Sequence, residues 1–390
     1  MRNISSTIVG WGHTPFGKLT NFSLEDLIVS AGQSALKSAG IQARDVDAVW
    51  LGHFNSGMVP DAFCSSMILN IHEDLRYKPA IRCENACASG AAALYSAIDA
   101  IESGRIDTAL VIGAEKMTGL DTAGVTRALG GASYQLEESH LSFPAIFALY
   151  AKAYAKRYGD PTAAMARIAV KNHANALKNP LAHMNKALDF EFCLTPSERN
   201  PMIADPLKVS DCSLISDGAA AVVLTRRDRL IDFRWGVGFR AAEQVSDVLP
   251  LSRKDLPAFE GPSRAFAKAY AQAGIGVDDL SFAEVHDCFT IAELLSMEAM
   301  GLSKSGQAGA MVEEGITAIG GRLPINVSGG LKAKGHPVGA TGLSMHVMAA
   351  RQLTGQAEQL QLPKAELGLC FNMGGGAVTN CVSILEPVKV

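Results

Sequence analysis

The chain repeats one succession of elements in its two halves, and this duplication limits the folds available to it. A helical pattern ends at Gly40 in the first half and at Gly274 in the second. Each is followed by a short acidic linker and an apolar strand, in which His53 and His286 hold matching positions. The strand patterns span 48–54, 108–113 and 214–224 in the first half, and 282–289, 367–371 and 377–385 in the second. Near-continuous apolar strands are typical of sheets covered on both faces, so the sequence predicts two similar α/β halves.

A second pair of repeated elements predicts two buried central helices. Cys87 is followed by a run of tiny residues, 88–93, that has no polar face. A helix of this kind must be buried on every side. In the second half the matching helix is predicted to begin at 335–337, with Pro337 at the first helical position. Backbone N–H groups and the positive dipole end at a helix start favour thiolate, so Cys87 has the features of an activated nucleophile.

The halves differ by one long insertion. The residues between Gly113 and Cys212 have no counterpart in the second half. Phe147, Tyr150 and Tyr154 recur there at helical spacing, which predicts ordered helices rather than a disordered segment. We therefore expect an N-terminal half formed by 1–118 and 205–232, an inserted loop domain at 119–204 and a C-terminal half at 233–390.

Composition excludes several classes of protein. Apolar residues make up 48% of the 390-residue chain and charged residues 19%, which is typical of a well-packed α/β enzyme. The net charge of −4 predicts no basic surface for nucleic acid. The uncharged stretch 367–385 is interrupted by glycines and asparagines, so we expect no transmembrane helix and no membrane partner. The ends, 1–5 and 387–390, show neither a signal region nor a peroxisomal ending, so we expect a cytoplasmic protein.

The cysteines form neither a disulfide framework nor a zinc-ribbon pattern. No Cys-x-x-Cys pair occurs and the spacings are irregular, so most are expected to be reduced, buried thiols. Cys83, which precedes Cys87, is expected to be structural. No histidine or carboxylate lies at ligand spacing from His336, so we predict no metal.

His286 and Cys288 form a second group of candidate catalytic residues. They are two residues apart, so on an extended segment their side chains point to the same side and that of Asp287 points away. Thr290 and Glu293 make a capping-box pattern for a following helix. The pair is therefore predicted at a strand end just before a helix, where the active sites of open α/β sheets gather.

Three motifs resemble signatures of the thiolase superfamily. They are Cys87-Ala88-Ser89-Gly90, His286-Asp287-Cys288-Phe289 and Gly335-His336-Pro337-Val338-Gly339-Ala340-Thr341-Gly342, and the stretch 326–334 before the last is also similar. The resemblance covers essentially the whole chain. It implies an α/β thiolase fold, in which two duplicated α-β-α-β-α halves form five layers and carry an inserted loop domain.

One departure from the family pattern narrows the resemblance. Many thiolases have a reactive cysteine in a Cys-x-Gly-Gly-Gly motif near the C-terminus, where this chain has Asn372-Met373-Gly374-Gly375-Gly376. They also have Asn-Glu-Ala-Phe in place of 286–289. The second reactive cysteine is then Cys288. This pattern is similar to the sterol-carrier-protein-2-type thiolases, including members that lack the carrier domain.

The resemblance implies a role for each candidate residue. Cys87 is the nucleophile that takes the acyl group from acyl-CoA, and His336 deprotonates it and helps to hold the thioester oxygen. His286 contributes to an oxyanion hole, and Cys288 transfers a proton. The backbone N–H groups of Gly374 and Cys87 form a second oxyanion hole. Coenzyme A is then a substrate, and no permanently bound cofactor is expected.

Contacts to coenzyme A are less visible in the sequence. No P-loop is present, and Gly130-Gly131 and Gly320-Gly321 lack the Lys-Ser or Lys-Thr pair that such a loop requires. Lys332 and Lys334 lie near the Gly335–Gly342 motif and are either solvated surface charges or ligand contacts.

The resemblance implies an acyltransferase, and three alternatives stay open. The expected reaction is thiolytic cleavage of a 3-oxoacyl-CoA, as in the β-oxidation of lipids, or the reverse Claisen condensation. The expected assembly is a homodimer or tetramer. Related aldolases tend to lose the cysteines, and acyl-CoA condensing synthases lack a second reactive thiol, so both fit less well. The last alternative is a non-catalytic subunit bound to a small OB-fold partner.

Overall fold

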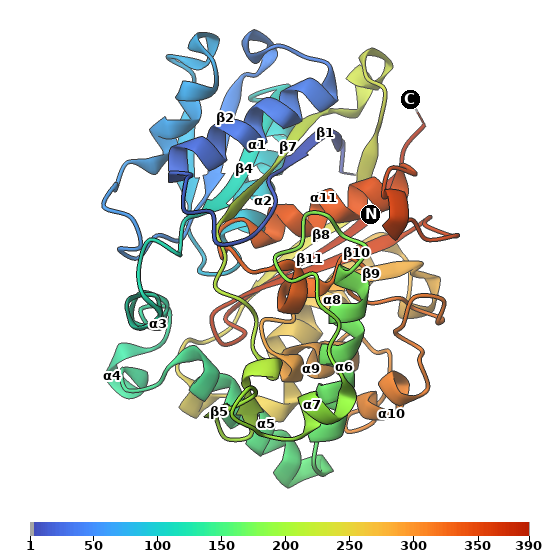
Figure 1. Ribbon diagram of the computed structural model, residues 1–390. Coiled ribbons are helices and arrows are strands. Elements are labelled where there is room, and N and C mark those ends of the chain that lie inside the picture. The colour runs from blue at the N-terminus through green and yellow to red at the C-terminus, as the bar shows by residue number, and fades with distance from the viewer. Residues whose placement is uncertain (1–3, 390) are drawn as a thin grey trace.

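The computed structural model describes residues 4–389, and its centre is one mixed β-sheet (Figure 1). The strand order is β3-β2-β4-β7-β1-β8-β11-β10-β9. The first half contributes β1 (Ser6–His13), β2 (Ala48–Gly52), β3 (Ala80–Cys83), β4 (Thr108–Glu115) and β7 (Gly218–Arg226). The second half contributes β8 (Val237–Ser246), β9 (Phe282–Val285), β10 (Gly368–Gly374) and β11 (Thr379–Pro387). Backbone pairing between β1 and β8 joins the two halves.

The strand pairing is the same in both halves, which confirms the predicted duplication. In the first half β2 pairs in parallel with β3 and β4, whereas β4–β7 and β7–β1 are antiparallel. In the second half β9–β10 is parallel, whereas β10–β11 and β11–β8 are antiparallel. In the second half, a parallel bridge between Ala283 of β9 and Ile325 is the equivalent of the pairing between β2 and β3 in the first half. His53 and His286 therefore occupy equivalent positions, directly after β2 and β9.

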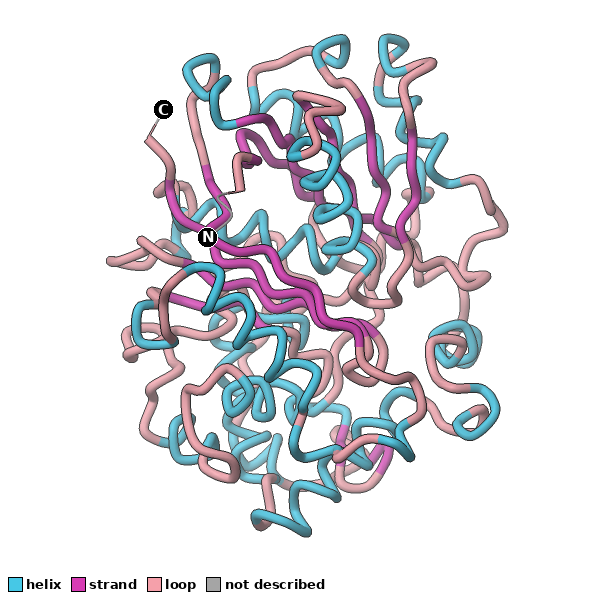
Figure 2. The backbone as a smooth tube through the Cα atoms, turned by 180° about the vertical axis from the view of Figure 1, so that it is seen from behind, coloured by secondary structure: helices cyan, strands magenta, loops and turns pink. Residues whose placement is uncertain are grey.

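Helices cover both faces of each half of the sheet (Figures 1 and 2). The outer helices α1 (Leu24–Ala39) and α8 (Glu260–Ala273) contact the strands of the first and second halves respectively. The central helices α2 (Ser89–Glu102) and α11 (Thr341–Leu353) contact each other, and α2 packs on β2 and β4 while α11 packs on β7 and β10. Alternation along β2 explains the layering, because Val49 packs in the cluster with α1 and Trp50 in the cluster with the central helices. The expected five-layer arrangement is confirmed.

The two central helices begin close together because glycine stands at their point of contact. A Cβ atom on Gly342 would lie 2.4 Å from the backbone nitrogen of Ala91 and 2.5 Å from Oδ1 of Asn372. A Cβ atom on Gly90 would lie 2.8 Å from the carbonyl oxygen of Gly339. Close-packed interiors leave no room for such approaches, so only glycine permits this contact. The packing brings the segments that precede α2 and α11 to one place.

The predicted start of the second central helix is wrong. Helix α11 begins at Thr341 rather than at 335–337, and Pro337 lies in the turn before it. The carbonyl of Pro337 accepts hydrogen bonds from the N–H groups of Ala340 and Thr341. Gly335 has a φ of 115°, a conformation that glycine adopts readily and that a helix cannot continue through. His336 consequently sits in an irregular turn and not on the helix.

The predicted capping box at the next helix is also wrong. Helix α9 (Thr290–Ala299) has Phe289 as its N-cap, and no side-chain cap is formed. The Thr290 hydroxyl instead donates to Asp211 over 2.9 Å. Glu293 pairs with Lys171 at 2.8 Å. Both side chains bond across the fold because the start of α9 is buried against other elements.

The insertion is ordered and contacts both halves. It contains α3 (Thr122–Gly130), α4 (Gln135–Glu138), α5 (Phe143–Tyr158), α6 (Thr162–Ala176), α7 (Phe190–Leu194) and β5 (Met202–Ala204), which pairs with β6 (Leu207–Lys208). As expected, Phe147, Tyr150 and Tyr154 lie buried on one helix, α5. Helices α5 and α6 lie on the second half, where both contact α9 and α6 also contacts α10 (Ala308–Glu313). Helix α3 packs against residues of the first half such as Phe54 and Met58. The boundaries of 119–204 as a separate domain remain a prediction.

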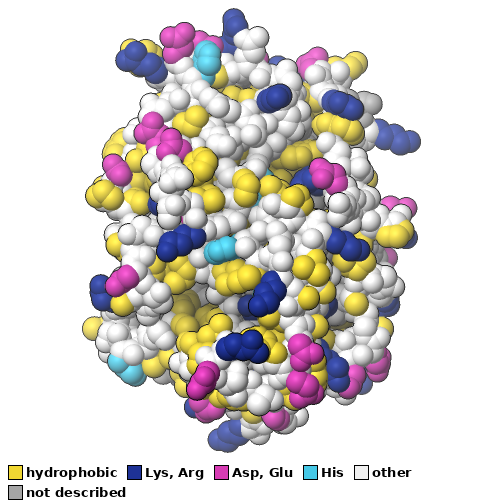
Figure 3. Space-filling model, in the orientation of Figure 1, with side chains coloured by type: hydrophobic (Ala, Val, Ile, Leu, Met, Phe, Trp, Pro, Cys, Tyr) yellow, Lys and Arg dark blue, Asp and Glu magenta, His cyan; other side chains and the backbone are white. Residues whose placement is uncertain are grey.

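The described surface offers no membrane-spanning element. Within residues 4–389 no helix combines the length and the apolar composition needed to cross a bilayer. Charged side chains of both signs are spread over the face shown in Figure 3, in keeping with the small net charge of −4. The terminal residues 1–3 and 390, on which part of the localisation prediction rests, lie outside the described residues.

We expect Gly342→Ala to destabilise the protein by about 3 kcal/mol, the upper end of the range for overpacking, because its Cβ would meet backbone at the helix contact. The free energy of unfolding, obtained from urea titration, measures the effect. Gly130→Ala is the matched control, because a Cβ atom at Gly130 meets nothing within 4 Å. Equal stability of the two variants would contradict the close helix contact.

Candidate active site

Cys87 lies in a tight turn between β3 and α2. Ala86 has a φ of 50°, and the turn is closed by Ser89, whose hydroxyl donates to the carbonyl of Ala86 over 2.6 Å and accepts from the N–H of Asn85 over 2.9 Å. The N-cap of α2 is Ala88, so Cys87 lies just before the helix rather than in its first turn. The turn presents the thiol at the end of the central layer.

His286 and Cys288 follow β9 on the opposite side of the site. The alternation predicted for this segment is confirmed by Asp287, whose carboxylate points away and is fully buried. Its oxygens accept hydrogen bonds from the N–H groups of Leu331 and Lys332 over 2.6 and 3.2 Å. These two residues belong to a π-helix, Gly330–Lys334, which leads into the turn that carries His336. Asp287 thus ties together the two segments of the second half that reach the site.

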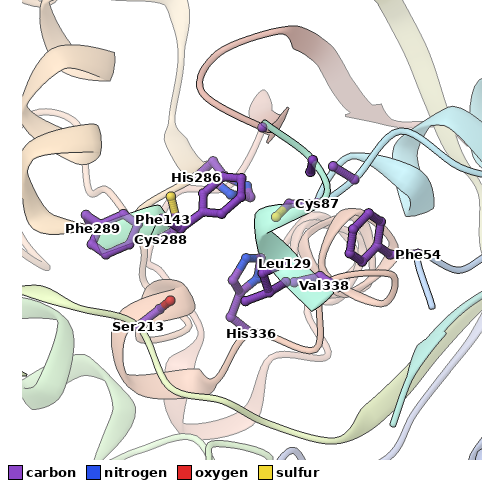
Figure 4. A pocket seen from close by; sticks show the side chains of 13 residues that line it. Phe54, Cys87, Leu129, Phe143, Ser213, His286, Cys288, Phe289, His336 and Val338 are labelled. Carbon is purple, nitrogen blue, oxygen red and sulfur yellow. The ribbon is translucent and has the colours of Figure 1, made fainter. Parts of the chain in front are cut away.

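Cys87, His286, Cys288 and His336 line one cavity of about 60 Å³ (Figure 4). The sulfur of Cys87 and one nitrogen of each histidine all lie within 4.8 Å of one another. The two imidazole rings are nearly perpendicular, with centroids 5.1 Å apart. The remaining wall is largely apolar and includes Phe54, Leu129, Phe143, Phe289 and Val338. Residues from both halves and from the insertion therefore meet at this one cavity.

Hydrogen bonds fix the protonation of His336. Its Nδ1 lies 2.7 Å from the hydroxyl of Thr341, which donates its own hydrogen to the carbonyl of Pro337 over 3.0 Å. The hydroxyl oxygen must therefore accept from Nδ1–H, which leaves Nε2 unprotonated. Nε2 has no hydrogen-bond partner among residues 4–389. Burial lowers the pKa of His336 to about 3, so the ring is a neutral base at physiological pH.

Two family descriptions cover most of the chain. "Thiolase, N-terminal domain" matches residues 6–228, and "Thiolase C-terminal domain-like" matches residues 242–387. The chain belongs to the thiolase family. The resemblance carried by the Cys87, His286 and Gly335–Gly342 motifs is thereby confirmed.

Comparisons with individual proteins show which members of the family this chain is similar to. It is 37% identical to "Acetyl-CoA acetyltransferase" of Methanothermobacter thermautotrophicus over 99% of this chain and 100% of that protein. It is 32% identical to "Sterol carrier protein 2" of Bos taurus, over 95% of this chain and 70% of that protein. Among solved structures, the Ltp2-ChsH2(DUF35) aldolase matches with a TM-score of 0.84 and 22% identity, covering 100% of this chain and 99% of that one. Human mitochondrial 3-ketoacyl-CoA thiolase matches with a TM-score of 0.76 and 17% identity, covering 98% and 99%. At such identities these two structures show the fold alone.

The surroundings of Cys87 in this thiolase oppose the predicted thiolate. Burial, together with the negative charge of Glu115, raises the pKa of the Cys87 thiol to about 12, although the backbone amides of Gly375 and Cys87 lower that pKa. The helix start therefore does not by itself produce a thiolate in the ligand-free protein, and activation of Cys87 by a nearby imidazole remains a prediction. Desolvation outweighs these backbone amides, so the Cys87 thiol is protonated in the ligand-free protein and would need a base in order to act as a nucleophile.

Cys288 is also a neutral thiol. Burial, followed by the nearness of Cys87 and Asp287, holds the pKa of Cys288 well above its usual value. The carbonyl of Cys288 accepts a hydrogen bond from the N–H of Ser213 over 2.9 Å. A protonated thiol in the cavity wall suits the donation of a proton to a carbanion.

Sequence reasoning missed one residue of the cavity wall and one residue directly behind it. Ser213 contributes a polar side chain beside Cys288, and no motif in the sequence marked it. Asn372 lies behind the wall, where its Nδ2 is 3.0 Å from the carbonyl oxygen of Cys87 and 3.1 Å from Nδ1 of His286. The signal for Asn372 was present, because it occupies the place of the reactive cysteine of many thiolases.

The glycine turn after β10 approaches the site through Gly375. Gly375 lines the cavity, whereas Gly374 is the last residue of β10 and packs against the turn that carries Cys87. A Cβ atom on Gly374 would lie 2.2 Å from the carbonyl oxygen of Asn85. The backbone amide that acts on the Cys87 thiol belongs to Gly375. The oxyanion role of Gly374 remains a prediction.

Lys332 and Lys334 are not surface charges. Their exposed fractions are 3% and 1%, and neither residue lines the cavity. The surface alternative in the sequence analysis is therefore wrong. Both lysines lie on the buried π-helix that Asp287 holds in place.

Cys87, His286 and His336 are also the group among residues 4–389 whose spacing could hold a metal ion. The sequence predicted no metal here, and that stays a prediction.

We expect alkylation of Cys87 by iodoacetamide in the ligand-free protein to accelerate about tenfold per pH unit between about pH 7 and pH 9. A thiol whose pKa is raised to about 12 stays protonated over this range, and only the thiolate reacts. Mass spectrometry of the Cys87 peptide measures the rate. A rate independent of pH would reveal a thiolate–imidazolium pair and contradict the neutral thiol.

If His336 is the base of the reaction, Thr341→Val should lower kcat about 10- to 100-fold, the range known for removing the hydrogen-bond partner that orients a metal-ligating histidine. The variant keeps the side-chain volume but removes the acceptor for Nδ1–H of His336. The KM for coenzyme A should change little, because Thr341 does not line the cavity. Thr341→Ser keeps the hydroxyl and is the matched control; equal losses in both variants would contradict the hydrogen-bond role.

Proposed function

We propose that this thiolase cleaves a 3-oxoacyl-CoA with coenzyme A, or runs the reverse Claisen condensation, through an acyl-enzyme on Cys87. The observation that carries the proposal is the convergence of one sulfur and two imidazole nitrogens within 4.8 Å, with a second thiol, Cys288, in the same cavity wall. The relative named "Acetyl-CoA acetyltransferase", 37% identical over 99% of this chain, supports an acyltransferase.

The first half of the proposed reaction is attack and carbon–carbon cleavage. Nε2 of His336 takes the Cys87 proton while the sulfur bonds to the 3-keto carbon, and the carbonyl electrons move to its oxygen. Backbone N–H groups of the Gly374–Gly375 turn and of Cys87 face that oxygen. The C2–C3 bond then breaks, and its electron pair forms the enolate of the departing acyl-CoA. His286 stabilises the enolate oxygen, and Cys288 gives its proton to C2.

The second half releases the acyl group. The Cys288 thiolate takes the proton of the incoming coenzyme A thiol, whose sulfur attacks the acyl carbon on Cys87. The Cys87–acyl bond breaks, and the sulfur regains the proton held by His336. Every proton is returned, so the protein ends unchanged and needs no permanently bound cofactor.

The size of the cavity supports a short acyl group. A volume of about 60 Å³ accommodates only a few non-hydrogen atoms, since one water already needs about 10–15 Å³. Phe143 and Phe289 enclose it with other apolar side chains. We therefore propose acetoacetyl-CoA, or a similarly short 3-oxoacyl-CoA, as the preferred substrate over long-chain compounds.

The proposal also includes an oligomeric state, a partner protein and a cellular location. The outer edge of β3 ends the sheet, and Ile81 on it is 42% exposed, which favours a homodimer paired at this edge or a tetramer built from such dimers. A small OB-fold protein is a candidate partner. The match to the Ltp2-ChsH2(DUF35) aldolase, a thiolase-fold protein with a second component in its name, points to the same idea. We propose a cytoplasmic role in lipid metabolism, including β-oxidation.

The test is a thiolysis assay with 3-oxoacyl-CoAs of increasing chain length, followed by loss of the enolate absorbance. We expect the highest kcat/KM for acetoacetyl-CoA, and a loss of at least about 10³-fold in Cys87→Ser, because a hydroxyl is a far weaker nucleophile. Cys83→Ser is the matched control, since Cys83 lies outside the cavity wall.

Cys288→Ala separates the alternative reactions. The proposed mechanism predicts severe loss of thiolysis while Cys87 still becomes acylated, as seen by intact-protein mass spectrometry. A condensing synthase would keep most of its activity in this variant. Activity on 3-oxoacyl-CoA that survives Cys87→Ser would reject the acyl-enzyme and favour an aldolase.

A further inference from the structure

The protonation state of His286 determines whether its ring donates a hydrogen bond to the cavity or accepts a proton or a metal ion there. The ring is 1% exposed, and burial, with the neighbouring His336 adding to it, holds the pKa of His286 well below its usual value. The ring is therefore neutral near pH 7 and carries one hydrogen, on Nδ1 or on Nε2. Nδ1 is bonded to Asn372, so Nε2 is the nitrogen left for the cavity. A protonated Nε2 donates to a substrate oxygen, whereas an unprotonated one acts as a base or a metal ligand.

The amide of Asn372 decides between these two states. Its Nδ2 lies 3.0 Å from the carbonyl oxygen of Cys87, which can only accept a hydrogen bond. The amide must therefore turn its NH₂ group, and not its oxygen, toward this carbonyl. The same NH₂ group lies 3.1 Å from Nδ1 of His286 and has a second hydrogen to give. Nδ1 is then the acceptor, and the ring hydrogen belongs on Nε2.

Packing keeps the amide in this orientation. Asn372 is 1% exposed and lies on β10, and its Oδ1 has no hydrogen-bond partner among residues 4–389. Gly342 of α11 leaves just enough room for that oxygen, since a Cβ atom there would lie 2.5 Å from it. Rotating the amide by 180° would set Oδ1 against the Cys87 carbonyl and lose that hydrogen bond, and the contact with Nδ1 of His286 would be kept only with its donor and acceptor reversed.

We propose that Asn372 is a positioning residue that holds His286 as the Nε2–H tautomer, so that His286 donates a hydrogen bond to the oxygen of the substrate. The inference rests on the proposed function, and it explains how one site contains both a hydrogen-bond donor, His286, and a base, His336. Thr341 holds His336 in the opposite state, with Nδ1 protonated and Nε2 free. The two neighbouring imidazoles therefore differ in role because their buried partners differ.

The same tautomer disfavours a metal ion. Cys87, His286 and His336 have the spacing of three metal ligands, and cysteine with histidine is a donor set that zinc accepts. A histidine binds a metal through a lone pair, and the Nε2–H state offers none to the cavity. By holding this tautomer, Asn372 makes the site suited to binding an oxygen atom with partial negative charge rather than a cation.

The direct test is nitrogen-15 NMR of the histidine-labelled, ligand-free protein. We expect the His286 ring, identified by the signals that disappear in His286→Gln, to show a protonated Nε2 and an unprotonated Nδ1 at about pH 7. A protonated Nδ1, or a rapid exchange between the two states, overturns the proposal. The measurement needs no substrate, so it stands apart from the proposed function: thiolysis can fail while the tautomer holds, and the reverse.

The second test replaces Asn372 so that the hydrogen is drawn to the other nitrogen. In Asn372→Asp the carboxylate can only accept, so Nδ1 of His286 must carry a hydrogen, and a neutral ring then loses the donor toward the substrate. Nitrogen-15 NMR of the variant distinguishes this neutral ring from an imidazolium of the kind that Glu115 stabilises at His53, which would keep the donor. We expect kcat for thiolysis to fall about 10²- to 10³-fold, the effect of losing one oxyanion donor, with a much smaller change in the KM for coenzyme A. A variant with the wild-type tautomer and kcat overturns the proposal.

Asn380→Asp is the matched control for this substitution. Asn380 is also buried, on β11, but its amide donates to backbone carbonyls such as that of Ala377 over 3.2 Å and contacts neither histidine. Equal losses of kcat in Asn372→Asp and Asn380→Asp would assign the effect to buried charge and overturn the positioning role. Zn²⁺ provides a readout besides activity: it should bind Asn372→Asp at least about tenfold more tightly than the wild type, because a lone pair then faces the cavity. Equal zinc affinity would count against the proposal.

Discussion

The contact between the starts of α2 and α11 is the constraint on which the site depends. Gly90 and Gly342 lack the side-chain volume that would hold the two helices apart, since a Cβ atom at Gly342 would come within 2.4 Å of backbone. Cys87 comes from the first half, whereas both histidines and the second thiol of the cavity come from the second half. Neither half contains a complete site, so the chemistry depends on how closely the two halves pack.

Buried carboxylates hold the turns that this packing brings together. Glu115, at the end of β4, accepts hydrogen bonds from the N–H groups of Asn55 and Gly339 over 2.9 and 3.0 Å, and so connects the loop after β2 to the turn that carries His336. Asp287 does the same within the second half, between the segment after β9 and the π-helix. A buried carboxylate is costly without donors, and here backbone N–H groups supply them.

The charge of Glu115 is balanced locally. Burial alone would lower the pKa of His53, but the adjacent Glu115 carboxylate overcomes this and raises the pKa of His53 to about 10. The two side chains form a buried pair with 3.0 Å between Nδ1 and Oε1. His53 occupies the position in the first half that His286 occupies in the second, so duplication has produced one charged, structural histidine and one neutral histidine at the cavity.

Much of this arrangement was predictable because it follows from local patterns. The duplication appears in apolar runs and helix-ending glycines such as Gly40 and Gly274, and both adopt the left-handed conformation that ends a helix. The pairing of His286 with Cys288 on one side follows from strand alternation. The predictions that failed depend on tertiary packing: the turn at Gly335, the burial of Lys332 and the desolvation of Cys87 leave no mark in nearby sequence. Asn372 was visible as a departure from the family motif, but its partners come from distant segments.

The neutral state of the Cys87 thiol and the His336 ring determines how the thiol can be activated. A Cys87 pKa of about 12 and a His336 pKa of about 3 make proton transfer between them unfavourable by about 12 kcal/mol before any mutual attraction is counted. Attraction between the resulting charges, whose atoms lie within 4.8 Å, returns only about 4 kcal/mol at the effective dielectric typical of proteins. A resting ion pair is therefore disfavoured, and in the proposed reaction the proton leaves as the sulfur bonds to the substrate carbon. In that proposed reaction the negative charge then appears on the 3-keto oxygen instead of on sulfur, where fixed backbone amides stabilise it, and after carbon–carbon cleavage the Nε2–H of His286 stabilises the enolate oxygen.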